Sequence, residues 1–140
     1  MPDQRFEMSE HVQNVLTGPE VKLFTEDGSV VPGIAGVAGV SDMIDAGLEI
    51  GADRLIMQPG SAFELHTHPG AHILYVLRNR GFIHVDGVDY EMTEGDTVYV
   101  PANFAHGVKT NPEVDDVLEI LAFGVPHMPI ESTKRMTLVK

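Results

Sequence analysis

Short β-rich stretches separated by turn signals constrain the fold of this chain more than any other feature of its sequence. The stretches are rich in valine, isoleucine, leucine and tyrosine, and they cover residues 21–24, 54–58, 72–77, 82–85, 97–100 and 118–123. The turn signals around them are Asp27-Gly28, Pro32-Gly33, Pro59-Gly60, Asp86-Gly87, Gly95-Asp96 and Asn111-Pro112. This spacing predicts an all-β sandwich or barrel rather than alternating strands and helices.

Two further elements are expected in the first third of the chain. Residues 10–16 predict a short helix, with Ser9 as its N-cap and Gly18 just beyond its end. The glycine- and alanine-rich stretch 33–39 predicts a closely packed strand. Because no helical pattern follows that stretch, it is not expected to bind phosphate as a glycine-rich loop does.

Composition excludes several classes of protein. At 140 residues and 43% hydrophobic content, the chain is expected to form one domain, residues 1–140, with a single core. It has no cysteine, no long apolar run and no secretion signal, so we expect a cytoplasmic protein without disulfides or a membrane span. The formal charge of −12 repels phosphate backbones and anionic lipids, so neither nucleic acid nor membrane is an expected partner.

Three of the seven histidines fall within the stretch His66-Thr-His68-Pro-Gly-Ala-His72. Residues i and i+2 of a strand face the same way, so His66 and His68 point together, and the Pro-Gly turn can bring His72 back beside them. Three imidazoles that converge at about 2.0–2.2 Å from one ion form a metal site. The same three residues could also lie in solvent on a surface hairpin.

A second segment favours the metal site. Gly95 is followed after five residues by Pro101-Ala-Asn103 and then, after two more, by His106. The segments 60–72 and 95–106 resemble the two motifs of the cupin superfamily, in which a glycine precedes His-x-His and a glutamate, and a second glycine precedes Pro-x-Gly and a histidine. The resemblance covers residues 60–110 closely.

The resemblance implies a cupin-type double-stranded β-helix, a jelly-roll barrel, with a core at about 48–125 and an N-terminal extension at about 1–47. It places metal ligands at His66, His68, His72 and His106. The first motif departs from the family pattern at two places: His72 replaces the usual glutamate, and Asn79 stands where a glycine is expected, with Gly81 two residues later. In the second motif, Asn103 replaces the glycine and Thr110 replaces the final asparagine. Asn103 is tolerable because asparagine adopts the left-handed conformation readily.

An all-histidine set implies one divalent transition metal per chain, of which iron, manganese, zinc, nickel and copper all suit imidazole. Four neutral ligands leave the ion near +2, a strong Lewis acid that favours an enolate or carboxylate. Because free histidine has a pKa near 6.5, we expect metal to be released below about pH 6.

The family resemblance favours a dioxygenase acting on a small enolisable or aromatic molecule. The alternatives are a non-redox cyclase, isomerase or lyase, and a non-catalytic binding protein.

Other residues have weaker expected roles. Glu64 shares strand parity with His66, so it is either a general acid or base at the site or a solvated residue at the barrel mouth. The apolar walls of the pocket are expected to be Leu74, Phe104 and Val108, and the two tyrosines expected to pack on the sheet are Tyr75 and Tyr99. Of the other histidines, His84 is expected to face away from the pocket, and His11 and His127 are expected on the surface. Cupins commonly pair as homodimers through their sheets or through exchanged terminal strands, and the resemblance implies the same here.

Overall fold

Nearly all of the regular structure is β-strand. The computed structural model describes residues 8–41, 50–126, 130–133 and 135–139. Within these ranges the elements are α1 (Met8–His11), β1 (Val21–Phe24), β2 (Val30–Ser41), β3 (Gly51–Met57), β4 (Ala62–Thr67), β5 (Ala71–Arg78), β6 (Arg80–Val85), β7 (Val88–Thr93), β8 (Thr97–Val100), β9 (His106–Thr110), β10 (Leu118–Val125) and β11 (Thr137–Leu138).

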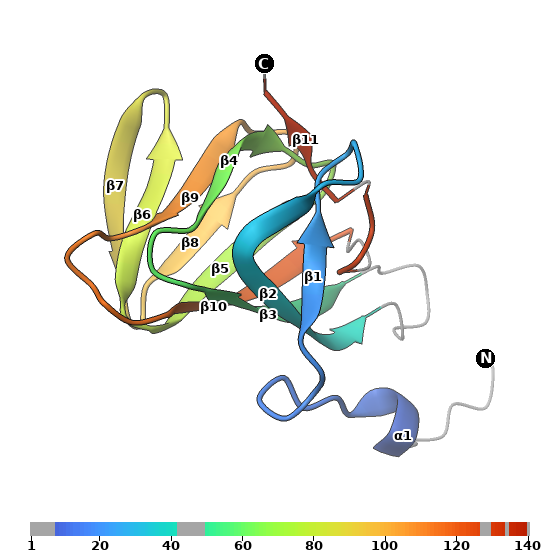
Figure 1. Ribbon diagram of the computed structural model, residues 1–140. Coiled ribbons are helices and arrows are strands. Elements are labelled where there is room, and N and C mark those ends of the chain that lie inside the picture. Colours follow the sequence, from blue (N-terminus) through green and yellow to red (C-terminus); the bar gives the residue numbers. More distant parts are fainter. Residues whose placement is uncertain (1–7, 42–49, 127–129, 134, 140) are drawn as a thin grey trace.

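The strands form two antiparallel sheets that lie against each other (Figure 1). The six-stranded sheet has the order β1-β2-β3-β10-β5-β8, and the five-stranded sheet has the order β11-β4-β9-β6-β7. From β3 onward the chain passes repeatedly from one sheet to the other, which is the jelly-roll arrangement. The prediction of an all-β jelly roll is confirmed.

The hydrophobic core lies between the sheets and follows the two-residue period of the strands. On β10, Leu118, Ile120 and Ala122 are buried at alternate positions, and on β5 Leu74 and Val76 are buried in the same way. Alternate side chains of a strand point to opposite faces, so the residues between these face outward. The core thus fills the space between the sheets on either side of the histidines described below.

Apolar side chains also cover part of the outer face of the six-stranded sheet. Ile73, Tyr75 and Leu77 of β5 are 48%, 38% and 37% exposed, and Tyr99 of β8 is 67% exposed. We call these four residues the β5–β8 patch. Both tyrosines face outward, as their parity predicts.

The N-terminal region departs from the sequence-based expectation at one point. The helix predicted over residues 10–16 is a single turn, Met8–His11, because the side-chain oxygen of Asn14 accepts hydrogen bonds from the backbone N–H groups of Leu16 (2.8 Å) and Thr17 (3.1 Å). Such a bond competes with helical pairing and turns the chain. Strand β1 lies at one edge of the six-stranded sheet, and β2 pairs with β1 on one side and with β3 on the other. Among the described residues, no helix is long or apolar enough to cross a membrane.

Two asparagines take the place of glycines in the connections. Asn103 has a φ of 60°, so the expectation of a left-handed residue there is confirmed. Asn79, the one residue between β5 and β6, has a φ of 65°. Asparagine tolerates this conformation better than most residues, which explains how the chain turns without a glycine at position 79.

Candidate metal centre

The bulge in β4 determines which of its side chains reach the interior. Phe63 pairs with Val108 and His66 pairs with His106, so three steps along β4 match two steps along β9. One extra residue in a strand reverses the facing of the residues beyond it. Phe63 and His66 are therefore both buried although they lie an odd number of residues apart.

The same bulge explains the position of Glu64. Uninterrupted parity with His66 would turn Glu64 inward, but the bulge between Phe63 and His66 interrupts that parity. Glu64 is exposed and lines a cavity of about 250 Å³ beside the turn between β1 and β2. Of the two alternatives for this residue, the structure favours a carboxylate in solvent.

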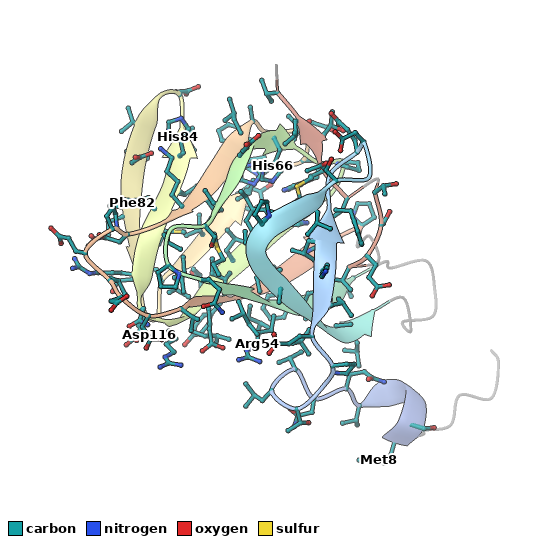
Figure 2. The ribbon with its side chains drawn as sticks, viewed as in Figure 1. Met8, Arg54, His66, Phe82, His84 and Asp116 are labelled. Carbon is teal, nitrogen blue, oxygen red and sulfur yellow. The ribbon has the colours of Figure 1, made fainter. Side chains whose placement is uncertain are left out.

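Three histidines converge between the sheets, where Figure 2 shows His66. His66, His68 and His106 are 5%, 4% and 3% exposed, and their ligand atoms all lie within 4.8 Å of one another. The ring centroids of His66 and His106 are 4.4 Å apart, and those of His68 and His106 are 4.8 Å apart. Strand β4 carries His66, the residue after its end is His68, and β9 begins with His106. The expected convergence of these three residues is confirmed.

Backbone carbonyls fix the orientation of each of these rings. The Nδ1–H of His66 donates to the carbonyl of Glu64 at 2.6 Å, that of His68 donates to Gly70 at 2.7 Å, and that of His106 donates to Phe104 at 2.8 Å. A neutral imidazole that donates through Nδ1 presents a lone pair at Nε2. Metal-binding histidines are commonly held in this way.

The facing nitrogens fit a shared metal ion. Nε2 of His68 lies 3.3 Å from Nε2 of His106. With both Nδ1 atoms protonated, neither Nε2 carries a hydrogen, so two buried lone pairs face each other without a donor between them. A cation about 2.1 Å from each nitrogen would satisfy both. The donor set therefore fits a divalent transition metal.

His72 lies beside the three converging rings. Its ring stacks on that of His68, with centroids 4.0 Å apart and an interplanar angle of 18°. Among the described residues, the group whose ligand atoms lie mutually within 4.8 Å contains His66, His68 and His106 and does not include His72. His72 is thus adjacent to the candidate metal centre, and its place in the ligand set stays a prediction.

Burial keeps these imidazoles neutral. Removal from water lowers the pKa of His66 to about 3, that of His68 to about 4 and that of His72 to about 2, and neighbouring positive charge adds to each shift. Burial also lowers the pKa of His106. A buried group without a compensating partner favours its uncharged form. All four rings are therefore ready to bind a cation near neutral pH.

A cavity of about 30 Å³ opens beside the histidines. Leu74 and Val108, two of the expected pocket walls, line it together with Phe63 and Met136. Phe104 was also expected as a pocket wall, and that prediction is wrong: its side chain is 39% exposed and is not among the described residues that line the cavity. Phe104 closes the turn that contains Asn103, with its N–H donating to the carbonyl of Pro101 at 3.3 Å, and it serves the site through its own backbone carbonyl, which holds His106.

Sequence reasoning missed a buried ion pair at this cavity. Arg135 lines the cavity, and its Nη1 lies 3.1 Å from Oδ2 of Asp53 on β3. The sequence carries one indication that Asp53 is buried: it lies two and four residues before Leu55 and Met57, so its side chain shares their buried face of β3.

The remaining histidines lie away from the cavity or outside the described residues. His84 of β6 pairs with Gly107 of β9, but its ring makes a 2.6 Å contact with the carboxylate of Asp89 and is not among the described residues that line the cavity. This agrees with its expected position facing away from the pocket. The side chain of His11 and the whole of His127 fall outside the part of the chain that the structure describes.

Comparison with known proteins places this geometry in a family. A family model described as "Cupin domain" matches residues 53–123, about half of the chain, and spans all of the histidines discussed above at the site. The chain is 29% identical over 111 residues to an uncharacterized protein from Methanocaldococcus jannaschii, covering 79% of this chain and 83% of that protein. It is 33% identical over 70 residues to an oxalate-binding protein from Thermotoga maritima, covering 49% of this chain and 56% of that protein.

Solved structures share the fold at low sequence identity. The structure of a polyketide cyclase from Streptomyces resistomycificus matches with a TM-score of 0.70 and 15% identity, covering 91% of this chain and 84% of that chain. At this identity the likeness bears on the fold alone.

Proposed function

Because this chain belongs to the cupin family, we propose that it is a metal-dependent enzyme acting on a small organic molecule. The ligands would be His66, His68 and His106, with His72 as a fourth. A divalent ion held there would act as a Lewis acid toward an enolate or carboxylate oxygen. The leading reaction is a dioxygenase-type oxidation, and the second is a non-redox cyclisation, isomerisation or elimination.

One observation carries this proposal: the two Nε2 atoms of His68 and His106, 3.3 Å apart, face each other without a hydrogen between them. Both rings are buried, and their Nδ1 atoms are already bonded to backbone carbonyls. Buried polar atoms left in this way are costly unless a cation satisfies them. A purely structural histidine cluster would be expected to place a donor opposite each acceptor.

The protein residues would position and enclose the substrate. Leu74 and Val108 form apolar walls on either side of the histidines, and such walls exclude water from a bound organic group. Since the imidazoles are neutral and the ligand set has no carboxylate, the charge of the ion is not offset by its own ligands. A site of this kind favours anionic ligands over neutral ones.

The two reactions differ in their need for oxygen. Loaded with ferrous iron, an oxygenase should consume oxygen when it meets its substrate among β-diketones, flavonols and catechols. The measurement is oxygen uptake with an electrode, and the control is His106→Ala protein with the same total iron. Uptake equal to that of free iron across this panel would reject an oxygenase acting on these three classes of compound.

Turnover of the same panel by the zinc-loaded protein without oxygen would favour the non-redox reaction. A polyketide cyclase has the same fold, so the fold itself is compatible with this second candidate. The third candidate is a non-catalytic binding protein, for which the resemblance to an oxalate-binding protein is the supporting observation. It requires saturable binding of a ligand that is recovered unaltered.

The chain is further proposed to act in the cytoplasm as a homodimer, without nucleic acid or membrane partners. The β5–β8 patch offers apolar surface for a second copy, since contiguous exposed apolar side chains often mark an interface.

We expect Tyr99→Asp to weaken dimerisation at least about tenfold, because it places a charge in that contact. Light scattering at micromolar concentration measures it, and Tyr90→Asp, at a 56% exposed tyrosine of the other sheet, is the control. A monomeric wild-type mass would contradict the dimer.

A further inference from the structure

Arg135 is a buried cation at the candidate metal centre that no sequence motif marks. Its side chain is 7% exposed, and Asp53, its ion-pair partner at 3.1 Å, is 1% exposed. Arg135 lies in the segment just before β11, whereas Asp53 lies on β3 of the opposite sheet. Burial of such a pair carries a desolvation cost that its own attraction does not reliably offset. This cost points to a role for the pair beyond stability.

The guanidinium lies within reach of the histidines. Arg135 lines the same 30 Å³ cavity as His66, His68, His72 and His106. Its positive charge is one of the causes that lower the pKa values of His66, His68 and His72. Asp53 holds the arginine from the side of β3, so the side chain is fixed before any ligand arrives.

Charge around the cavity favours an anion. Among the described lining residues, Arg135 is the single one with a permanent charge, because the histidines are neutral. Asp53 offsets the charge of Arg135, and no carboxylate belongs to the converging ligand group. The charge of a bound divalent ion would remain uncompensated until an anionic ligand enters.

The size of the cavity limits what can enter. A buried water needs about 10–15 Å³ of such space, so a cavity of about 30 Å³ accommodates roughly two water-sized groups. Two ligand oxygens, one directed to Arg135 and one directed to the metal site, meet this limit, whereas an aromatic ring does not. The larger part of any substrate would have to lie outside this cavity.

We propose that Arg135 is a specificity-determining residue that receives the carboxylate of a small organic acid whose adjacent oxygen binds the metal. The planar guanidinium suits a carboxylate because it offers parallel N–H donors. The inference rests on the proposed metal site and narrows its substrate class to small carboxylates with a second metal-binding oxygen next to the carboxylate. Oxalate is the simplest probe of that class.

Calorimetric titration of oxalate into metal-loaded protein tests the inference without measuring turnover. Arg135→Met should weaken oxalate binding about ten- to a hundredfold, the effect of losing a hydrogen-bonded charge. Binding of imidazole, a neutral metal ligand, should stay unchanged in the same variant. A purely structural role for Arg135 would not separate these two ligands.

Two further variants keep the test decisive. Arg54→Met is the matched control, because Arg54 of β3 is also a largely buried, ion-paired arginine but bonds to Glu119 and to the carbonyl of Val15. It should leave oxalate affinity unchanged. If Arg135→Met fails to fold because the buried carboxylate of Asp53 loses this ion pair, the double variant Asp53→Asn/Arg135→Met removes both charges and should show the same weakening.

The outcomes separate this inference from the proposed function. Wild-type protein that takes up no metal overturns both. Wild-type protein that holds metal but does not bind oxalate overturns the inference alone. Equal oxalate affinity in the wild type and in the folded arginine variants shows that Arg135 only secures the C-terminal segment.

Discussion

His106→Ala protein is expected to lose metal affinity by more than about a hundredfold, beyond the loss typical of a partner that only supports a ligand. His106 is the ligand proposed on β9, and its ring lies next to both His66 and His68. Removing it leaves His66 and His68, both from one end of β4, and the proposed fourth ligand His72, so the site loses its one ligand from the five-stranded sheet beyond β4. The measurement is metal content after purification, followed by titration against a chromophoric chelator.

The control is His84→Ala, which removes a histidine of the same sheet whose ring contacts Asp89 and not the cavity. It should keep full metal content. His72→Glu addresses the fourth position, because it restores the ligand usual at that place and should keep the metal while changing its spectrum. An unchanged affinity and spectrum in that variant would remove His72 from the ligand set, and full metal content in His106→Ala would contradict the metal centre itself.

Local patterns were sufficient to predict most of the strands. The segments 21–24 and 97–100 match β1 and β8 residue for residue, because valine-, leucine- and tyrosine-rich stretches between turns fit a pleated surface. The convergence of His66 and His68 also follows from local geometry, since residues two apart share a face. Convergence with His106 came from the spacing of a second motif rather than from any single residue.

The failures depend on contacts between distant parts of the chain. Parity left Glu64 open between the site and solvent, because the bulge that reverses its facing is set by pairing with β9. Phe104 was placed in the pocket, yet only its carbonyl serves the site. Arg135 and Asp53 lie 82 residues apart, and nothing near either residue in the sequence specifies the other. Register and long-range ion pairs are properties of the folded sheets, so local patterns do not reveal them.

Acid should destabilise the metal-free protein at pH values well above those that titrate carboxylates. The pKa of His66 is lowered to about 3 and that of His68 to about 4, chiefly by burial, while both lie near 6.5 in the unfolded chain. The unfolded state therefore binds more protons as the pH falls below about 6.5, so the free energy of unfolding decreases. Each such histidine contributes about 1.4 kcal/mol per pH unit until its folded pKa is reached.

The same shifts change the expected pH of metal release. Free histidine, with a pKa near 6.5, predicts release below about pH 6, but rings that stay neutral in the folded protein to about pH 4 do not compete with metal until then. We therefore expect metal to remain bound at pH 5 and to leave in the same cooperative transition as unfolding. The metal-free protein should unfold at a higher pH than the loaded protein, because the ion binds the native state.

Circular dichroism and a chelator that reports free metal, followed together from pH 7.5 to 3, measure both events. A sample stripped of metal is the matched control, since it carries the same histidines without the ion. Release near pH 6 from protein that is still folded would mean that the imidazoles titrate as exposed groups. That result would contradict a buried centre, because the lowered pKa values depend on the same exclusion of water that makes the site favourable for an anionic ligand.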